Sequence, residues 1–134
     1  MTHFSISTPR REALVDITEP VAAAAAQHPR AAALMVLSPH TTCGILINEG
    51  ADPDVAHDVT AFLQRIVPQS PHFRHMEGNA DAHIKTILVG NSVHVLVESG
   101  RLRLGTWQRI FLAEFDGPRR RTVWVQPLAA PSEG

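Results

Sequence analysis

Two histidines and two acidic residues stand within nine residues of the chain, in the segment 75–83, which reads His-Met-Glu-Gly-Asn-Ala-Asp-Ala-His. One methionine and two alanines are its apolar residues, so the segment has too little apolar surface to belong to a core. Clusters of imidazole and carboxylate groups bind divalent metals and also transfer protons. We therefore expect a metal or phosphate site on a loop that leads into a helix; a solvated loop without a site is the alternative.

A third histidine with polar neighbours, His40, lies in the sequence Ser-Pro-His-Thr-Thr of residues 38–42, directly before an apolar run. Together with His75 and His83 it would supply the three neutral imidazoles of a zinc-type site that keeps one position open for water or substrate. The alternative is a histidine whose nitrogens are hydrogen-bonded by the neighbouring hydroxyl groups at the end of a strand.

Two carboxylates are candidates for acid and base catalysis. Glu49 follows a run expected to form a buried strand, where a carboxylate has no helix to cap, and it could be a general base or a partner to a ligand histidine. Asp81 stands two residues before His83 and could equally be a functional acid or a helix cap.

Candidates for substrate binding lie in several further segments. Trp107 can stack on a heteroaromatic ring while Gln108 hydrogen-bonds the edge of that ring, although a tryptophan in the core is the alternative. Arg119 follows the turn at residues 116–118 and can reach an anion, or it can belong to a solvated strand edge. The full set of predicted substrate-binding residues is Thr41, Asn79, Trp107, Gln108 and Arg119.

The apolar pattern predicts which elements position these residues. Alternating or continuous apolar residues predict strands, and apolar residues at helical spacing between caps and prolines predict helices. We expect strands over residues 2–8, 13–16, 31–37, 43–47, 93–97, 102–104, 106–115 and 121–126, and helices over 18–28, 53–66 and 80–90. These elements form one α+β domain over residues 1–134, with a largely antiparallel sheet or sandwich and flanking helices, and residues 127–134 form a flexible tail.

Composition restricts the class of protein. The chain has 134 residues, 44% of them hydrophobic and 19% charged, which is typical of one soluble domain, and it has no apolar stretch long enough to span a bilayer. A formal net charge of −1 argues against a general nucleic-acid binder. A single cysteine, Cys43, and the lack of a secretion signal favour the cytoplasm.

Five segments taken together resemble the YjbQ-like family, also described as the secondary thiamine-phosphate synthase family. They are residues 40–42 (His-Thr-Thr), residues 48–55 around Asn-Glu and Ala-Asp-Pro-Asp-Val, His75 with residues 78–83, residues 104–108 (Leu-Gly-Thr-Trp-Gln) and residues 115–119 (Phe-Asp-Gly-Pro-Arg). The resemblance implies a compact α+β domain with a mixed or largely antiparallel sheet, which assembles as a homotrimer with clefts near the subunit interfaces.

The resemblance also implies a site and an activity. The site is a metal-associated cluster carried onto His40, His75 and His83, with zinc the first candidate for the divalent ion. The activity is thiamine-phosphate synthesis, in which an aminopyrimidine diphosphate is joined to a thiazole phosphate with release of diphosphate. We thus expect a metal-associated transferase acting on small phosphorylated substrates, with Glu49 or Asp81 as acid or base. The alternative is a non-catalytic trimeric module that binds a metal or an anion.

Overall fold

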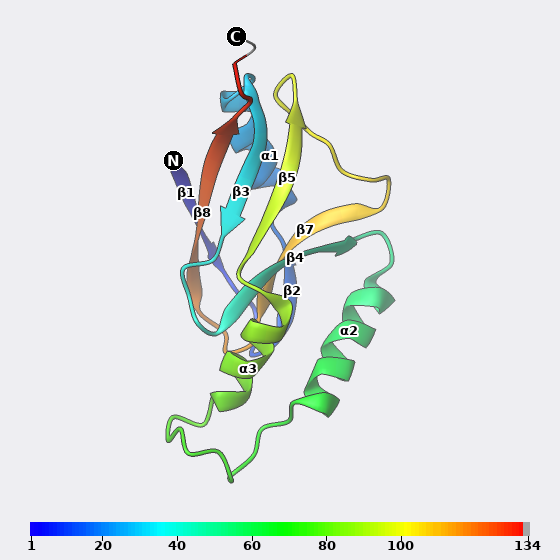
Figure 1. The fold of residues 1–134 in the computed structure, drawn as a ribbon. Helices are drawn as coiled ribbons and strands as arrows, with labels where there is room; N and C mark the ends of the chain where they lie inside the picture. The colour runs from blue at the N-terminus through cyan, green and yellow to red at the C-terminus, as the bar shows by residue number, and fades with distance from the viewer. Residues whose placement is uncertain (133–134) are drawn as a thin grey trace.

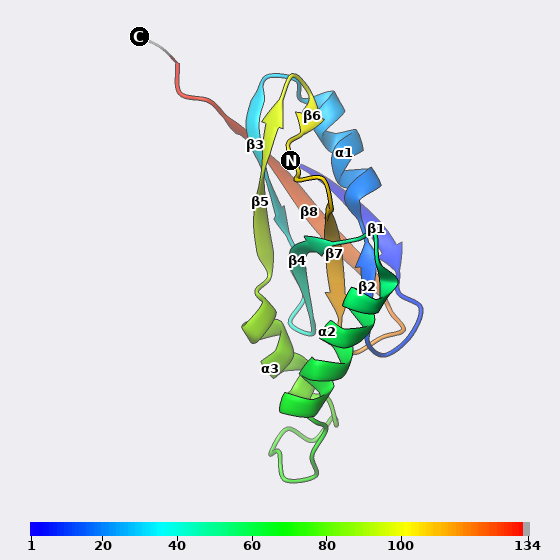
Figure 2. The ribbon, with the colours of Figure 1, turned by 90° about the vertical axis from the view of Figure 1, so that its right-hand side faces the viewer.

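Two antiparallel sheets face each other in the structure, a computed structural model that describes residues 1–132. A five-stranded sheet has the order β1-β8-β3-β5-β6, and a three-stranded sheet has the order β2-β7-β4 (Figures 1 and 2). The strands are β1 (Thr2–Ser7), β2 (Ala13–Asp16), β3 (Ala31–Leu37), β4 (Cys43–Glu49), β5 (Ser92–Glu98), β6 (Arg101–Leu102), β7 (Gln108–Glu114) and β8 (Arg120–Ala129).

The core lies between the sheets because side chains of a strand alternate between its two faces. Leu34 and Val36 of β3 point inward, and so do two buried valines each of β5 and β8. From the opposite sheet, β4 supplies Ile45, and β7 supplies Ile110 and Leu112. Every pairing recorded within these sheets is antiparallel. The predicted α+β fold is therefore confirmed, with antiparallel rather than mixed sheets.

The outer face of the five-stranded sheet carries apolar residues. Figure 2 shows α1 (Thr18–Gln27) and α2 (Pro53–Ile66) on the other side of this sheet and α3 (Ala80–Val89) beyond the lower end of β5, so none of these three helices of the described chain covers this face. Leu96 on β5 is 67% exposed there, and Trp124 on β8 is also exposed. The register places Ala33 beside Leu96 and Leu37 beside Trp124, so the exposed apolar residues extend across neighbouring strands.

Two of the three helices pack closely on the sheets. Helix α1 (Thr18–Gln27) buries Val21, Ala24 and Ala25, which explains how an alanine-rich segment covers the core. Helix α3 (Ala80–Val89) ends at Gly90, whose positive φ of 95° is easily reached only without a side chain. The C-terminal end of α3 lies so close to β4 that a Cβ on Gly44 would be 2.5 Å from the Gly90 carbonyl oxygen.

Helix α2 (Pro53–Ile66) is held more loosely. Asp52 caps it by accepting a hydrogen bond from the Asp54 amide at 2.9 Å, as the order Asp-Pro-Asp predicts. However, none of its residues is buried, and Phe62 and Ile66 are exposed. The prediction of the helix is confirmed, and its apolar residues are at most partly buried.

The C-terminal strand is longer than the sequence predicts. A flexible tail is expected from residue 127, but residues 127–129 continue β8 and pair with β3 as far as Ala31 opposite Ala129. A proline has no N–H to donate to a neighbouring strand. Pro127 is tolerated in β8 because the pairing of β8 with β1 reaches only as far as Val125, so no β1 residue lies opposite Pro127 to accept that hydrogen bond. Residues 130–132 have no regular structure, and residues 133–134 lie outside the described chain.

Candidate functional site

A cavity of about 410 Å³ lies between the loop that joins β3 to β4 and helix α3. Hydrogen bonds fix its two sides together, because the Ser38 amide donates to the Asn91 carbonyl at 2.8 Å and the Ile45 amide to the Gly90 carbonyl at 3.1 Å. The residues that line it are His40, Thr41, His83, Thr86, Ile87, Gly90 and Asn91. Two of the three predicted histidines, His40 and His83, therefore share one cavity, which we call the histidine cleft.

His40 is held in one tautomer. The backbone amide of Thr122 donates a hydrogen bond to Nε2 of His40 at 2.9 Å, so Nδ1 carries the proton of the neutral ring. Burial lowers the pKa of His40, and the nearby positive charge of Arg121 lowers it further. The imidazole thus stays neutral at neutral pH and has one N–H left to donate.

A buried ion pair lies behind the loop of His40. Arg121 donates through Nε to Oε1 of Glu114 at 2.8 Å and through Nη2 to Oε2 at 2.5 Å, and both side chains are almost fully buried. The same Nη2 also donates to the hydroxyl of Thr42 at 2.8 Å, and Thr8 donates to Glu114 at 2.8 Å. This network fixes the position of Thr42 and therefore of the loop that carries His40.

His83 has a different environment. Its ring lies 5.2 Å from the ring of His75, edge to face at 84°, and both rings line a second, shallower cavity of about 330 Å³. In the described chain no hydrogen bond to either nitrogen of His83 is recorded, so both ring nitrogens are available to a ligand in the cavity. His75 lies 3.7 Å from the carboxylate of Glu77, on the exposed side.

The three histidines do not form the predicted metal site. Residues 1–132 contain no group of three His, Cys, Asp or Glu side chains placed to hold a metal ion. One physical reason is that Nε2 of His40 already accepts the Thr122 amide, so that nitrogen has no lone pair for a metal. Within residues 1–132 the structure therefore does not bring His40, His75 and His83 together as a three-histidine metal site.

Asp81 lies on the other face of α3 from the histidine cleft. Residues two apart on a helix differ by about 200°, so Asp81 and His83 point in opposite directions. Asp81 accepts hydrogen bonds from Arg11 at 3.0 to 3.2 Å and from Lys85 at 2.9 Å. Burial alone would raise the pKa of Asp81, but the bonds from Arg11 and Lys85 outweigh it and lower the pKa. The carboxylate stays ionised, which contradicts the predicted role as an acid beside His83.

Asn79 and Arg119 are both bound to Asp116. The Asn79 amide nitrogen donates to Oδ2 of Asp116 at 2.7 Å, and Nη2 of Arg119 donates to the same oxygen at 3.1 Å. Neither residue lines the histidine cleft. Oδ1 of Asn79 is buried and has no hydrogen-bond partner in the described chain.

The remaining predicted residues lie at the opposite end of the three-stranded sheet. Glu49 pairs with Gln108, whereas Cys43, three residues from His40, pairs with Glu114 at the other end of the same ladder. Seven residues of strand separate the two ends by about 20 Å. Trp107 is 62% exposed, and the Gln108 side chain accepts the Gly105 amide at 2.8 Å. Within one chain, Glu49, Trp107 and Gln108 therefore cannot act in the histidine cleft.

Sequence reasoning missed several residues near α3. Thr86, Ile87 and Asn91 line the histidine cleft, and Lys85 is buried on the opposite face of the helix. The spacing of Asp81 and Lys85, four residues apart with Lys85 the sole lysine of the chain, was the available signal for the buried pair. Thr86 and Asn91 have no such signal, because their role depends on how α3 lies against the loop of His40.

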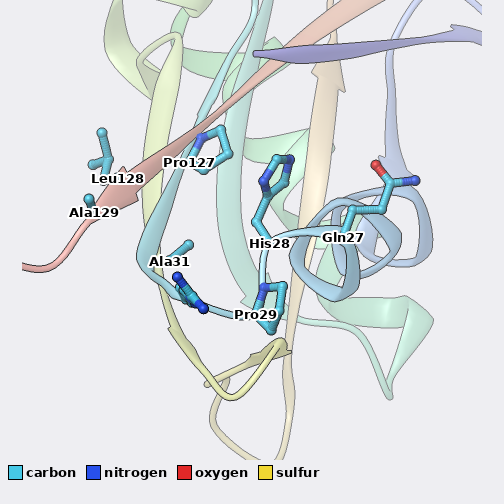
Figure 3. Close-up of a pocket in the computed structure, with 8 residues that line it drawn as sticks. Gln27, His28, Pro29, Ala31, Pro127, Leu128 and Ala129 are labelled. Carbon is cyan, nitrogen blue, oxygen red and sulfur yellow. The ribbon is translucent and has the colours of Figure 1, made fainter.

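A separate cavity of about 370 Å³ lies at the far end of the five-stranded sheet, between the end of α1 and the end of β8 (Figure 3). His28 and two prolines, Pro29 and Pro127, are among its lining residues. No residue of the predicted site lines it.

The chain is similar to proteins from archaea and bacteria along most of its length. The UPF0047 protein MJ1081 of Methanocaldococcus jannaschii is 49% identical over 92% of this chain and 90% of that protein, and the UPF0047 protein YugU of Bacillus subtilis is 47% identical over 93% and 96%. The crystal structure of the conserved hypothetical protein TT1486 from Thermus thermophilus matches 96% of this chain and 100% of that chain with a TM-score of 0.90 and 47% identity. A YjbQ/UPF0047 protein from Clostridium acetobutylicum matches 96% and 100% with a TM-score of 0.92 and 42% identity.

These similarities do not support the predicted reaction. The names of the relatives give neither thiamine-phosphate synthesis nor metal binding, and the structure has no three-residue metal site in residues 1–132. The residues expected to hold the two substrates also lie at opposite ends of the three-stranded sheet. The expectation of a metal-associated thiamine-phosphate synthase, and with it the alternative of a metal-binding module, is therefore wrong.

The family itself is clear from the whole chain. A family model described as UPF0047 protein YjbQ-like matches residues 2–130, which include every helix and strand of the structure. Together with the identity to relatives over nine-tenths of the chain, this match shows that the chain belongs to the YjbQ-like UPF0047 family.

Proposed function

We propose that the chain is an enzyme that binds a small phosphorylated molecule in the histidine cleft and uses His83 to transfer a proton. The observation that carries the proposal is the placement of two imidazoles from separate segments on one cavity of about 410 Å³. A cavity of this size is in the range of small-molecule sites.

His40 has the role of a hydrogen-bond donor in this proposal. Because its Nε2 accepts the Thr122 amide, Nδ1–H is the group that remains for a phosphate oxygen. Thr41 and Asn91 are exposed polar residues on the same cavity, and they add a hydroxyl and an amide that can bind phosphate oxygens. The binding group is thus neutral and depends on directed hydrogen bonds.

His83 has the role of the proton carrier. In hydrolysis of a phosphate ester, the oxygen of a water molecule bonds to phosphorus while the bond from phosphorus to the leaving oxygen breaks. His83 takes one proton from that water and returns it to the leaving oxygen, so the products are an alcohol and inorganic phosphate. The lack of a hydrogen-bond partner for His83 in the described chain supports this role, because no protein group competes for its ring nitrogens, and histidine is the side chain that most often transfers protons in catalysis.

We also propose that the chain forms a homotrimer through the outer face of the five-stranded sheet, in the cytoplasm. Support for the interface comes from Leu96 and Trp124, two exposed apolar residues on the same face of the sheet. The number of subunits follows from the resemblance to the family. No helix of residues 1–132 is long and apolar enough to cross a membrane, and Cys43 is a free buried thiol.

The assembly is tested by changing the outer face. Leu96→Glu places a charge among apolar residues of that face, and light scattering after gel filtration is expected to show a change from trimer to monomer. Met76→Glu, at an exposed residue of the loop before α3, is the matched control and should leave the mass unchanged. A monomeric wild-type protein would contradict this part of the proposal.

The enzymatic activity is tested by a screen of small phosphate esters, with release of inorganic phosphate as the readout. The wild-type protein is expected to hydrolyse at least one ester, and His83→Asn should lower kcat by about 100-fold or more because the proton carrier is lost. His72→Asn, in the exposed loop between α2 and α3, is the control and should retain wild-type turnover. Phosphate release that is equal in wild type and His83→Asn, or none from any ester, would contradict the proposal.

A further inference from the structure

A second polar cavity lies on the other side of α3. It has a volume of about 220 Å³, and its lining includes the four charged side chains Arg11, Glu12, Asp81 and Lys85. We call it the lysine chamber. It adjoins a groove of about 760 Å³ between α2 and the segment that connects β1 to β2, since Arg11, Glu12 and two glutamines line both spaces.

The ammonium group of Lys85 is the central group of the chamber. Its side chain is 1% exposed, and Nζ donates to Oε1 of Glu12 at 2.6 Å and to Oδ2 of Asp81 at 2.9 Å. A lysine ammonium has three N–H donors, and buried donors are nearly always paired. The described chain supplies partners for two of them, so one donor of a side chain that lines the chamber remains for a ligand or for water.

Acceptors with spare capacity surround this donor. Oδ1 of Asp81 accepts one hydrogen bond, from Arg11, and Oε1 of Glu12 accepts one, from Lys85, whereas each carboxylate oxygen can accept two. Gln64 and Gln69 also line the chamber, with their amide nitrogens donating to Oε2 of Glu12 at 2.5 Å and to the Gly78 carbonyl at 3.3 Å, which leaves their amide oxygens as acceptors. A ligand there meets one ammonium donor and several carboxylate and amide oxygens.

The charges of the chamber are balanced. Two cations, Arg11 and Lys85, face two anions, Glu12 and Asp81, and they pair with one another at 2.6 to 3.7 Å. An ion that entered would add an uncompensated charge beside the buried side chains of Lys85 and Asp81, which is costly. A neutral hydroxyl group adds no charge, and it can accept from Lys85 while it donates to a carboxylate.

Small residues of α2 keep the adjoining groove open. Ala56, Thr60 and Ala61 form its wall on the helix side, opposite Leu14 of β2. An ion cluster that served only to fix α3 would need no such space beside it. The chamber with the inner part of the groove can therefore hold a ring-sized molecule, with its hydroxyl groups in the chamber.

We propose that the lysine chamber binds a neutral polyhydroxylated molecule of monosaccharide size, with one hydroxyl group between Lys85 and the carboxylates of Glu12 and Asp81. The proposal does not depend on the histidine cleft, because the chamber lies on the opposite face of α3 and the two cavities have no lining residue in common.

The test is a titration of the ¹⁵N-labelled full chain with D-ribose and with D-glucose, followed by backbone and lysine side-chain resonances. At least one of the two sugars is expected to cause saturable shifts at Lys85 and at residues that line the chamber, with a Kd of about 10 mM or tighter. Inorganic phosphate is the comparison probe and should not shift these resonances. Absence of saturable shifts with both sugars, or saturable phosphate binding at the chamber, would overturn the proposal.

Variants locate the binding. Gln64→Ala removes an exposed amide from the chamber and is expected to weaken sugar binding about three- to tenfold, the effect of one lost hydrogen bond. Arg65→Ala, next along α2 but outside the chamber and the groove, is the matched control. Because Lys85→Met removes the buried ammonium partner of two carboxylates and can unfold the protein, Gln64→Ala is the deciding variant. Equal affinity of Gln64→Ala and wild type would show that the sugar binds elsewhere.

Discussion

The backbone amide of Thr122 donates to Nε2 of His40 at 2.9 Å and so fixes the tautomer of a histidine that comes from a distant part of the chain. This bond links strand β8 to the loop between β3 and β4. It leaves Nδ1–H as the one donor of the ring, and it removes Nε2 from the set of groups that can bind a metal or accept a proton.

The environment of His40 predicts how stability depends on pH. Burial, followed by the charge of Arg121, lowers the pKa of His40 from 6.5 in the folded protein. The folded state therefore binds fewer protons than the unfolded state, and the stability that His40 contributes is present above pH 6.5 and is lost as the pH falls through the folded pKa. In urea unfolding below pH 6.5, His40→Gln should lose less stability than wild type with falling pH. If the free energy of unfolding fell equally steeply with pH in both proteins, the result would contradict this explanation.

The ion pair of Glu114 and Arg121 predicts a large effect on stability. Because both groups are almost fully buried, Arg121→Met leaves a carboxylate without its main partner and should lower the free energy of unfolding by about 3–5 kcal/mol. The control is Arg103→Ala, which removes an exposed partner of Glu98 and should cost less than about 1 kcal/mol. Urea unfolding at pH 7 measures both, and equal losses would mean that the buried pair has no special role.

The environment of Asp81 predicts that the stability of the protein also depends on pH in a more acidic range. Burial raises its pKa, but the hydrogen bonds from Arg11 and Lys85 lower it below 3.8 overall. A carboxyl group with a lowered pKa contributes stability above its unfolded pKa, and that stability is lost as the pH falls through the folded pKa. Asp81→Asn should therefore be less stable than wild type at pH 7, and the difference should shrink below about pH 4. A constant difference between pH 7 and pH 2 would contradict the ion-pair explanation.

Chelation tests the corrected view of the three histidines. Since residues 1–132 contain no three-residue metal site, treatment with a chelator should leave the melting temperature unchanged. The triple variant of His40, His75 and His83 to Gln should retain the same metal content as wild type in elemental analysis. A stoichiometric metal that disappears in this variant would show that the histidines bind metal after all.

Most of the fold could be predicted from the sequence because the apolar patterns are strong. The continuous run of β3 and the capped start of α2 predict the correct elements, since each pattern is local in the chain. The end of β8 could not be predicted in this way. Pro127 is typical of a strand end. In the structure, however, β8 continues past it, because β3 still pairs with β8 where β1 no longer does, and the missing N–H of Pro127 costs no hydrogen bond to β1.

The site was harder to predict, for geometric reasons. His40 and His83 do share a cavity, but Glu49 is at the other end of β4 and Asp81 is on the other face of α3. Closeness in the sequence was misleading in both cases. Side chains two residues apart on a helix point in nearly opposite directions, and the two ends of one strand lie about 20 Å apart. Lys85 was missed because its partner Glu12 is 73 residues away.

Binding of inorganic phosphate in the histidine cleft is the most direct test of the proposed function. The ¹⁵N-labelled full chain is titrated with inorganic phosphate at pH 7.5, and the imidazole resonances of His40, His83 and the exposed control His72 are followed. We predict saturable shifts at His40 and His83, none at His72, and a phosphate affinity that is at least about fivefold weaker in Asn91→Ala, which removes an exposed amide from the cleft. Saturable shifts at neither His40 nor His83, or equal affinity in Asn91→Ala, would contradict the claim that this cleft binds phosphorylated molecules.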